Sequence, residues 1–368
     1  MTYIHELKEW PRFSWNEKGL SEKLAAVRNR QGRLTGRMET LGFKLRAEAN
    51  LQSVTEEVIK SSEIEGEVLN RDQVRSSVAR RLGIDIGALT PADRNVEGIV
   101  EMMLNATGRY EEPLTFERLF SWHAALFPTG RSGMNKITVG GWRNDKTGPM
   151  QVVSGPIGHE RVHYEAPKAA KLDKEMKAFI DWFNANGIDP VLKAGIAHLW
   201  FVTIHPFDDG NGRIARAIAD MALARSEKSA QRFYSMSAQI KQEQKEYYDI
   251  LETTQKADLN ITPWLEWFLD CLDRAFDGAE TILASVLKKA RFWKKHAGES
   301  FNDRQRAMIE RLLNGFVGKL TSSKWAQLTK CSQDTALRDI DDLLARKVLV
   351  KDTAGGRSTS YSLADIVT

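Results

Sequence analysis

The sequence has few cysteines and no long apolar run. Its 368 residues include two cysteines, Cys271 and Cys331, which are too few for a disulfide framework and favour a reducing compartment. No segment approaches the ~20 consecutive apolar residues of a membrane-spanning helix. The polar and aromatic N-terminus lacks the apolar core of a secretion signal. We therefore expect a cytoplasmic protein with no membrane partner.

The sequence also has little excess charge. The net charge of +4 is spread along the chain and does not by itself indicate nucleic-acid binding. Neither low-complexity segments nor internal repeats are present. A hydrophobic content of 42% is enough for a sizeable core, and 368 residues leave room for two or three domains.

The stretch HPFDDGNGRIAR at 205–216 has the composition of an anion site. Gly210 and Gly212 lack a Cβ, so their backbone N–H groups can approach a ligand closely. The following residues, 213–225, contain no proline or glycine and predict a helix whose N-terminus favours phosphate. Arg213 and Arg216 share one face of that helix, and each guanidinium can donate two parallel hydrogen bonds to phosphate oxygens.

A base and a metal ligand are predicted in the same stretch. His205 precedes the loop, and an unperturbed histidine takes up a proton near pH ~6.5. Asp209 lies among the cationic groups, and a lone carboxylate near phosphates usually holds Mg²⁺. Together these features predict phosphoryl or nucleotidyl transfer. The plainer alternative is a helix-capping loop with surface arginines.

The stretch resembles the signature of the Fic family, HPFx(D/E)GNGRxxR, and every fixed position is matched. The resemblance implies transfer of AMP from ATP to a hydroxyl of a protein side chain. It implies that His205 deprotonates the hydroxyl and that Asp209 holds Mg²⁺. The α-phosphate would be cradled by Gly210, Asn211 and Gly212, and the outer phosphates would be bound by Arg213 and Arg216.

A second, shorter stretch resembles the inhibitory motif of Fic proteins, (S/T)xxxE(G/N). Its matched positions are Ser61, Glu65 and Gly66, and Gly66 also suits the end of a helix. In the family the glutamate pairs with the second signature arginine, here Arg216, and takes the place of a γ-phosphate oxygen. We therefore expect intramolecular inhibition. The alternative is a helix-end glutamate in solvent.

The glycine- and proline-rich segment 140–167 contains a short extended run and predicts a β-hairpin. It resembles the flap that covers the active site in Fic proteins, where a strand pairs with an extended segment of the protein substrate. Four flap residues would flank the nucleotide: Val152, Val153, Ser154 and Gly155. The alternative is an ordinary surface hairpin.

Two other strings in the sequence resemble known sites and are rejected. HExxH at 159–163 is a zinc-binding string only on a helix, and prolines and glycines around it prevent one. GxGxxA at 210–215 binds dinucleotides only after a strand, and a helix is predicted at 190–204 instead. His198 on that apolar helix is expected to be a core residue.

Residues 236–255 predict a helix that resembles the segment closing over adenine in the family. Its candidate contacts are Tyr247, Tyr248 and Gln255, because an aromatic face and an amide suit a purine. We expect one of the two tyrosines to be a core residue.

The predicted fold class is mainly α, in four parts. We expect a helical N-terminal region with the inhibitory motif at 1–91, a Fic core with its hairpin flap at 92–284, a basic linker at 285–300, and a C-terminal domain at 301–368. The N-terminal aromatic residues Trp10, Phe13 and Trp15 are expected to pack onto the body of the protein or onto a second copy, so a homodimer stays open.

Three helices and an extended pair at 301–368 resemble a winged helix-turn-helix, for which DNA binding is the usual function. The third helix carries four aspartates among its basic residues, whereas a phosphate-facing helix should be plainly basic. We favour a protein-contact role over DNA. The aspartates are Asp334, Asp339, Asp341 and Asp342.

The sequence therefore predicts a protein adenylyltransferase that uses Mg-ATP, modifies a Ser, Thr or Tyr hydroxyl of a target or of itself, and is inhibited by Glu65. Two alternatives stay open. One is a DNA-binding regulator whose Fic core senses nucleotide, and the other is removal of AMP at the same site.

Overall fold

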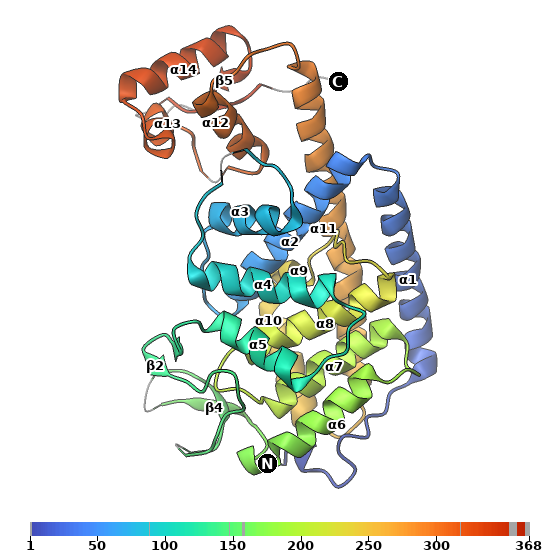
Figure 1. Ribbon diagram of the computed structural model, residues 1–368. Coiled ribbons are helices and arrows are strands. Elements are labelled where there is room, and N and C mark those ends of the chain that lie inside the picture. Colours follow the sequence, from blue (N-terminus) through green and yellow to red (C-terminus); the bar gives the residue numbers. More distant parts are fainter. Residues whose placement is uncertain are drawn as a thin grey trace. The chain divides into compact units, whose positions relative to one another are not determined.

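The computed structural model describes residues 2–87, 89–146, 148–156, 159–316, 318–352 and 359–364. It divides into two compact units, Met1–Glu280 and Thr281–Thr368 (Figure 1). The described residues form fourteen α-helices and three small antiparallel sheets of two strands each, which confirms the mainly α fold. No described helix is long and apolar enough to cross a membrane.

The first unit begins with three helices, preceded by a 3₁₀ turn at Ile4–Glu6. They are α1 (Glu17–Glu39), α2 (Phe43–Ile64) and α3 (Arg71–Leu82). The remaining helices are α4 (Arg94–Gly108), α5 (Phe116–Leu126), α6 (Leu172–Asn184), α7 (Pro190–Ile204), α8 (Asn211–Glu227), α9 (Met236–Gln242), α10 (Gln244–Gln255) and α11 (Thr262–Lys295). Between α5 and α6 lie two hairpins, β1 (Arg131–Ser132) with β2 (Asn135–Lys136), and β3 (Gln151–Ser154) with β4 (Arg161–Glu165).

Helix α7 forms the core of the first unit. Every residue from Val191 to Ile204 is buried, as expected of a helix that is apolar on all sides. Asp189 caps its N-terminus by accepting hydrogen bonds from two backbone N–H groups, and Pro190 occupies the first turn, where no N–H is needed. Helix α8 packs along α7, so the loop between them is held between two buried helices.

The N-terminal segment packs onto this core. The rings of Trp10 and Phe13 make edge contacts with Trp200 of α7, at centroid distances of 6.2 and 5.6 Å. Helix α1 lies at the edge of the unit and is tied to α11 by ion pairs such as Lys23–Asp270 at 2.5 Å (Figure 1). The aromatic residues therefore contact the body of the protein, the first of the two arrangements expected.

Two helices differ from the sequence-based boundaries. The helix expected at 236–255 is broken at Glu243 into α9 and α10. Helix α11 continues to Lys295, through most of the segment expected to be a linker. The lysines and arginines of that segment are good helix formers, and nothing in it breaks a helix before Gly298.

The second unit contains α12 (Asp303–Leu313), α13 (Ser322–Thr329), α14 (Gln333–Ala345) and a hairpin of β5 (Leu349–Lys351) and β6 (Tyr361–Leu363). Its core includes the fully buried Trp325, Ile340 and Leu343. Three helices followed by a hairpin match the expected order of elements. The assignment of this unit as a winged helix-turn-helix stays a prediction.

Candidate nucleotide site

The sequence 205–212 forms a tight loop between α7 and α8. His205 ends α7 in the left-handed conformation (φ 50°), and Gly210 precedes α8 with φ 81°. A left-handed conformation is costly for a residue with a Cβ and persists only where surrounding contacts hold it. At Gly210, an added Cβ would also come within 2.9 Å of the Phe127 ring. The loop therefore depends on glycine at 210 and is strained at His205.

The Asn211 side chain closes this loop. It accepts a hydrogen bond from the Phe207 backbone N–H at 3.0 Å and donates one to the Phe207 carbonyl at 2.8 Å. Asn211 is 2% exposed. Its amide is therefore committed to holding the loop, so any phosphate contact at this position falls to its backbone N–H. The cradling of the α-phosphate expected of Asn211 stays a prediction.

The N-terminus of α8 presents unpaired donors. No side chain caps it, and the first backbone hydrogen bond of the helix runs from Ile214 N–H to Gly210 O at 3.0 Å. The N–H groups of residues 211–213 have no partner inside the helix. At the start of a 17-residue helix these groups and the helix dipole favour an anion.

Two residues outside the signature fix the loop. Buried Arg143 donates from its backbone N–H to Pro206 O at 2.9 Å and from Nε to His205 O at 2.7 Å. The ring of buried His123 stacks on Phe207 at a centroid distance of 4.2 Å. Gly140 N–H donates to His123 Nδ1, so the other ring nitrogen, Nε2, carries the proton and donates to Asp209 O at 3.2 Å. Sequence reasoning missed both residues because each acts through a long-range contact.

The His205 imidazole is arranged as a proton acceptor. Its Nδ1 lies 3.2 Å from Val202 O, and a carbonyl can only accept, so Nδ1 carries the proton. Nε2 is then the basic atom. Burial lowers the pKa of His205 to about 4, so the ring is neutral at physiological pH. The sequence predicted a proton exchange nearer neutrality, because burial is not visible in it.

Arg216 is held by the segment at the end of α2. Its Nε donates to Ser61 Oγ at 2.9 Å, and its Nη2 donates to Ser61 O and to Glu65 Oε1, each at 2.8 Å. Helix α2 ends at Ile64, and Gly66 follows with φ 81°, as its expected role at a helix end requires. Two of the three motif residues, Ser61 and Glu65, therefore contact Arg216, and Gly66 ends the helix beside them.

The Glu65 carboxylate lies over the start of α8. A Cβ added to Gly212 would come within 2.2 Å of Glu65 Oε1. Arg216 is 3% exposed, and its Nη1 is buried without a partner in hydrogen-bonding geometry among the described residues. Such a buried donor is costly unless another acceptor is supplied. The site thus has capacity for an anion beyond the one that Glu65 provides.

A second carboxylate holds the first signature arginine. Arg213 Nη1 donates to Glu67 Oε2 at 2.8 Å, and the Arg213 guanidinium lies over the Phe127 ring at 5.1 Å from its centroid. Glu67 lies two residues after Glu65, beyond the end of α2. Sequence reasoning missed it because the inhibitory motif ends at Gly66.

Asp209 is available as a single metal ligand. Its Oδ1 accepts the Gly210 N–H at 2.6 Å, and its Oδ2 accepts the hydroxyl of Ser132. The described residues contain no group of three or more His, Cys, Asp or Glu that could hold a metal by themselves. A magnesium ion here would need phosphate oxygens for its other ligands. In the HExxH string, His163 lies on the strand Arg161–Glu165 and not on a helix.

Helix α10 brings two of the three expected adenine contacts into the core. Tyr247 is 2% exposed, and its hydroxyl is paired with His198 Nε2 at 2.8 Å. Gln255 is 6% exposed and donates to Thr203 Oγ1 at 3.2 Å. Tyr248 is 43% exposed, and its hydroxyl donates to Ile64 O at 3.3 Å. Of the two tyrosines, Tyr248 is therefore the one accessible to a ligand, and Tyr247 and His198 form part of the core.

The expected flap is present as the hairpin of β3 and β4. Gln151 pairs with Glu165 and Val152 with Tyr164, and the register shifts before Val153. All four β3 residues are exposed, and the hairpin projects from the helices (Figure 1). Gly155 follows β3 with φ 104°, a conformation that glycine tolerates. An exposed strand of this kind can pair with another chain.

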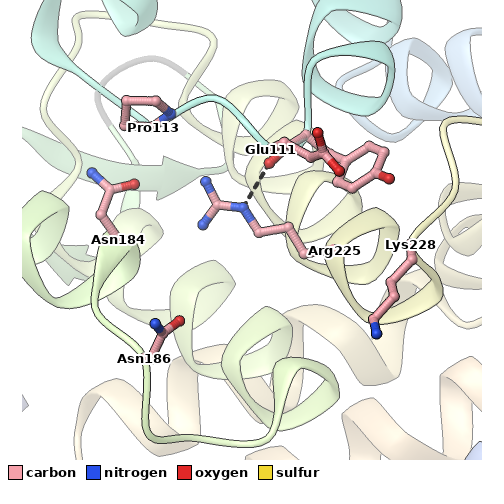
Figure 2. A pocket seen from close by; sticks show the side chains of 7 residues that line it. Glu111, Pro113, Asn184, Asn186, Arg225 and Lys228 are labelled. Carbon is pink, nitrogen blue, oxygen red and sulfur yellow. Dashed lines mark hydrogen bonds between the residues drawn. The ribbon is translucent and has the colours of Figure 1, made fainter.

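A separate hollow of about 550 Å³ lies between the end of α6 and the end of α8 (Figure 2). Arg225 points toward it, but its guanidinium already donates to the carbonyls of Tyr110 and Glu112 at 2.7 and 3.0 Å. Lys228 and Asn186 also line it. None of its lining residues belongs to the 205–216 stretch, so we do not assign it to the nucleotide.

Comparison with known families identifies the core of the first unit. Residues 113–223 match the model described as Fic/DOC family, and residues 3–84 match a domain of unknown function, DUF4172. The chain contains a Fic domain. The Fic match covers α5 to α8 and therefore includes the flap and the loop at 205–212.

Curated relatives of this chain carry the name "Protein adenylyltransferase Fic". Those of Drosophila willistoni and Culex quinquefasciatus are 26% and 27% identical to it over 234 and 235 residues, or 62% of this chain. The chain spans 42% of the length of each. Among solved structures, a Fic family protein from Desulfovibrio desulfuricans G20 aligns with a TM-score of 0.51 at 20% identity, covering 95% of this chain and 97% of its own. A Fic-domain signalling protein from Bacteroides thetaiotaomicron VPI-5482 aligns with a TM-score of 0.52 at 21% identity, covering 71% and 97%. At these identities the structures establish the fold.

Proposed function

We propose that this Fic protein transfers AMP from ATP to a hydroxyl of a protein side chain. The observation that carries the proposal is the neutral His205 imidazole, with Nδ1 bound to Val202 O, next to a helix N-terminus with unpaired N–H groups. A proton acceptor beside an anion site is what attack of a hydroxyl on a phosphate ester requires. The names of the curated relatives agree with it.

In this reaction His205 Nε2 takes the proton of the incoming hydroxyl. The hydroxyl oxygen forms a bond to the α-phosphorus, the bond from that phosphorus to the bridging oxygen breaks, and pyrophosphate leaves. The N–H groups of residues 211–213 stabilise charge on the α-phosphate. Arg213 and Arg216 would hold the outer phosphates, and the buried unpaired Nη1 of Arg216 supports that role.

Asp209 would hold Mg²⁺ together with phosphate oxygens, after its Oδ2 releases the Ser132 hydroxyl. A bound magnesium ion would neutralise charge on the phosphates. Because the described residues contain no cluster of three or more metal-binding side chains, the metal would enter with the nucleotide.

The proposed resting state is inhibited. Glu65 bonds Arg216 and overlies Gly212, so its carboxylate and an outer phosphate compete for one guanidinium. Glu67 competes in the same way for Arg213. Both carboxylates lie at the end of α2, so one movement of this segment would release both arginines.

The substrates would bind on either side of the loop. Tyr248 is the exposed ring that could stack on adenine, and the exposed backbone of β3 could pair with an extended segment of the target protein. Val152 and Val153 are 37% and 48% exposed on that strand and would contact the incoming chain.

Two further roles follow from particular residues. Retention of Glu65 beside the site makes AMP removal a second candidate reaction, because a carboxylate there can orient water. In the second unit, Asp339 is 5% exposed and bound by Arg304 at 2.7 Å, and Asp342 pairs with Arg346 at 3.0 Å. Two of the four α14 aspartates are thus engaged within the unit. The other two, Asp334 and Asp341, accompany a single arginine on that helix, Arg338, so α14 lacks the plainly basic face that phosphates favour. We propose that this unit contacts protein rather than DNA.

The experiment is transfer of α-labelled ATP to proteins of a cell lysate by the Glu65→Gly variant. We expect labelled bands that vanish in the Glu65→Gly, His205→Ala double variant. Thermal melting and calorimetric binding of a non-hydrolysable ATP analogue check that the double variant still folds and takes up nucleotide. Labelling that persists without the imidazole contradicts the proposal, and so does tight, salt-sensitive binding of a specific duplex by a protein that transfers no AMP.

A further inference from the structure

The flap contains an exposed serine that is hydrogen-bonded to a histidine, which is in turn bound by a carboxylate. Ser154 Oγ lies 2.6 Å from His163 Nε2, and His163 Nδ1 lies 2.6 Å from Glu252 Oε2. An ionised carboxylate can only accept, so Nδ1 carries the proton. In the neutral imidazole Nε2 is then without a proton and accepts from the Ser154 hydroxyl. This order of serine, imidazole and carboxylate is the arrangement that activates nucleophilic hydroxyls.

The carboxylate of this group is kept charged. Glu252 also accepts hydrogen bonds from Arg161 at 3.0 Å and Lys256 at 2.5 Å. Burial alone would raise the pKa of Glu252, but the hydrogen bonds from Lys256, His163 and Arg161 lower it to about 2. A permanent anion at Nδ1 fixes the imidazole and stabilises the cation that forms when Nε2 takes a proton.

The three residues come from separate elements that the fold brings together. Ser154 ends β3, His163 lies on the paired strand β4, and Glu252 lies on α10, 89 residues further along the chain. Gly155 follows the serine in a positive-φ conformation and presents no side chain beside it. The Ser154 hydroxyl is therefore accessible from solvent, whereas Glu252 is shielded behind the hairpin, with a side-chain exposure of 19%.

We infer that Ser154 is an activated nucleophile and the hydroxyl through which this chain modifies itself. In this step His163 takes the role that His205 has for the hydroxyl of another protein. Ser154 Oγ bonds to the α-phosphorus of ATP, the bond to the bridging oxygen breaks, pyrophosphate leaves, and the serine proton passes to His163 Nε2. The product is an AMP ester on the flap, on the strand proposed to meet the target. The adenylyl arm of the inference rests on the proposed function, whereas the activation of the serine does not.

The first experiment tests activation alone. Purified His205→Ala protein is treated with an ethyl fluorophosphonate probe, in which the serine oxygen displaces fluoride from phosphorus and the proton again goes to the imidazole. Peptide mapping should find the label on Ser154, with the exposed Ser21 as the internal background. We expect His163→Gln to slow labelling about a hundredfold, the low end of a general-base contribution. Glu252→Gln, which keeps the His163 imidazole but removes the charge beside it, should slow the labelling of Ser154 less.

The second experiment tests the adenylyl group. Glu65→Gly protein is incubated with α-labelled ATP and lysate, and the AMP sites are mapped on this chain and on other proteins. We expect AMP on Ser154, reduced at least tenfold by His163→Gln, while lysate proteins are still labelled. Labelled lysate proteins with an unmodified Ser154 overturn the inference and leave the proposed function standing. If nothing is labelled, the proposed function fails, and the fluorophosphonate result alone decides whether Ser154 is activated. The activation of Ser154 is overturned if fluorophosphonate labels Ser154 at a rate within tenfold of its rate at Ser21. It is also overturned if the rate at Ser154 is unchanged in His163→Gln.

Discussion

Substitution of Glu65 should raise the affinity for ATP and the rate of AMP transfer. Glu65 Oε1 bonds Arg216 Nη2 at 2.8 Å and occupies the space above Gly212 at the start of α8. The backbone at Glu65 has a negative φ (φ −86°, ψ 8°), so its conformation does not require glycine. Glycine at this position therefore removes the side-chain contact with Arg216 without releasing backbone strain. The change therefore isolates the competition between carboxylate and phosphate.

The size of the effect follows from that contact. A hydrogen bond to a charged group is worth ~1.5–3 kcal/mol net. Because the Glu65 side chain is 32% exposed, solvent screens the pair and the lower end applies. Since ~1.4 kcal/mol is tenfold in an equilibrium, the closed state is favoured about tenfold, and its loss should tighten the apparent affinity by about that factor. Glu65→Gln keeps a neutral hydrogen bond to Arg216 and should tighten the apparent affinity for ATP only roughly threefold.

The assay is calorimetric binding of a non-hydrolysable ATP analogue, followed by transfer of α-labelled ATP at sub-saturating nucleotide. Glu63→Gln is the matched control, because Glu63 lies in the same turn but pairs with Lys60 at 2.7 Å. We expect the control to behave as wild type. Wild-type affinity in both Glu65 variants, or an equal gain in Glu63→Gln, would refute the reasoning.

Three other substitutions test the geometry around the loop. Glu67→Gln should raise the rate of AMP transfer about two- to fivefold, less than Glu65→Gly. The reason is that the ion pair of Glu67 with Arg213 is more exposed, and a surface ion pair is worth ~0.2–1 kcal/mol. No gain in the single variant or in the Glu65→Gly background contradicts this. Asn211→Ala should lower the free energy of unfolding by roughly 1–3 kcal/mol, because the buried N–H and carbonyl of Phe207 lose their hydrogen-bond partner. It should also abolish AMP transfer. A denaturation midpoint equal to that of the wild type counts against this role of Asn211. Burial lowers the pKa of His198 to about 3, so the folded state binds fewer protons than the unfolded state and stability falls as pH drops from ~6.5 toward 4. His198→Gln should reduce the slope of unfolding free energy against pH by about 1.4 kcal/mol per unit in that range, and an unchanged slope shows that another group carries it.

Helix boundaries were predicted best where local chemistry sets them. The helix at 190–204 was predicted to the residue, because proline opens it and the apolar run ends at the signature. Helix α12 is also set locally, since Asn302 caps its first turn. The break at Glu243 was not predicted, because no proline or glycine in the sequence marks it. The extension of α11 to Lys295 was missed because its basic residues were interpreted as a linker, although lysine and arginine are good helix formers.

The sequence by itself determined the 205–216 stretch, the Ser61–Gly66 stretch and the hairpin, because residues close in the chain make each of them. It also predicted that Glu65 would meet Arg216, through resemblance to a family rather than through local pattern. Only the tertiary structure showed that Arg143 and His123 brace the loop and that burial shifts the pKa of His205 to about 4.

The same limit explains the contacts that no motif announces. Glu67 reaches Arg213 across 146 residues, and Glu252 reaches His163 across 89. Such pairs leave no periodic or spaced pattern, since each partner alone is an ordinary polar residue at the end of a helix or on a strand. The local chemistry of the chain decided where the 205–216 loop and its arginines lie in the sequence, and the packing of distant segments decided which carboxylates contact those arginines.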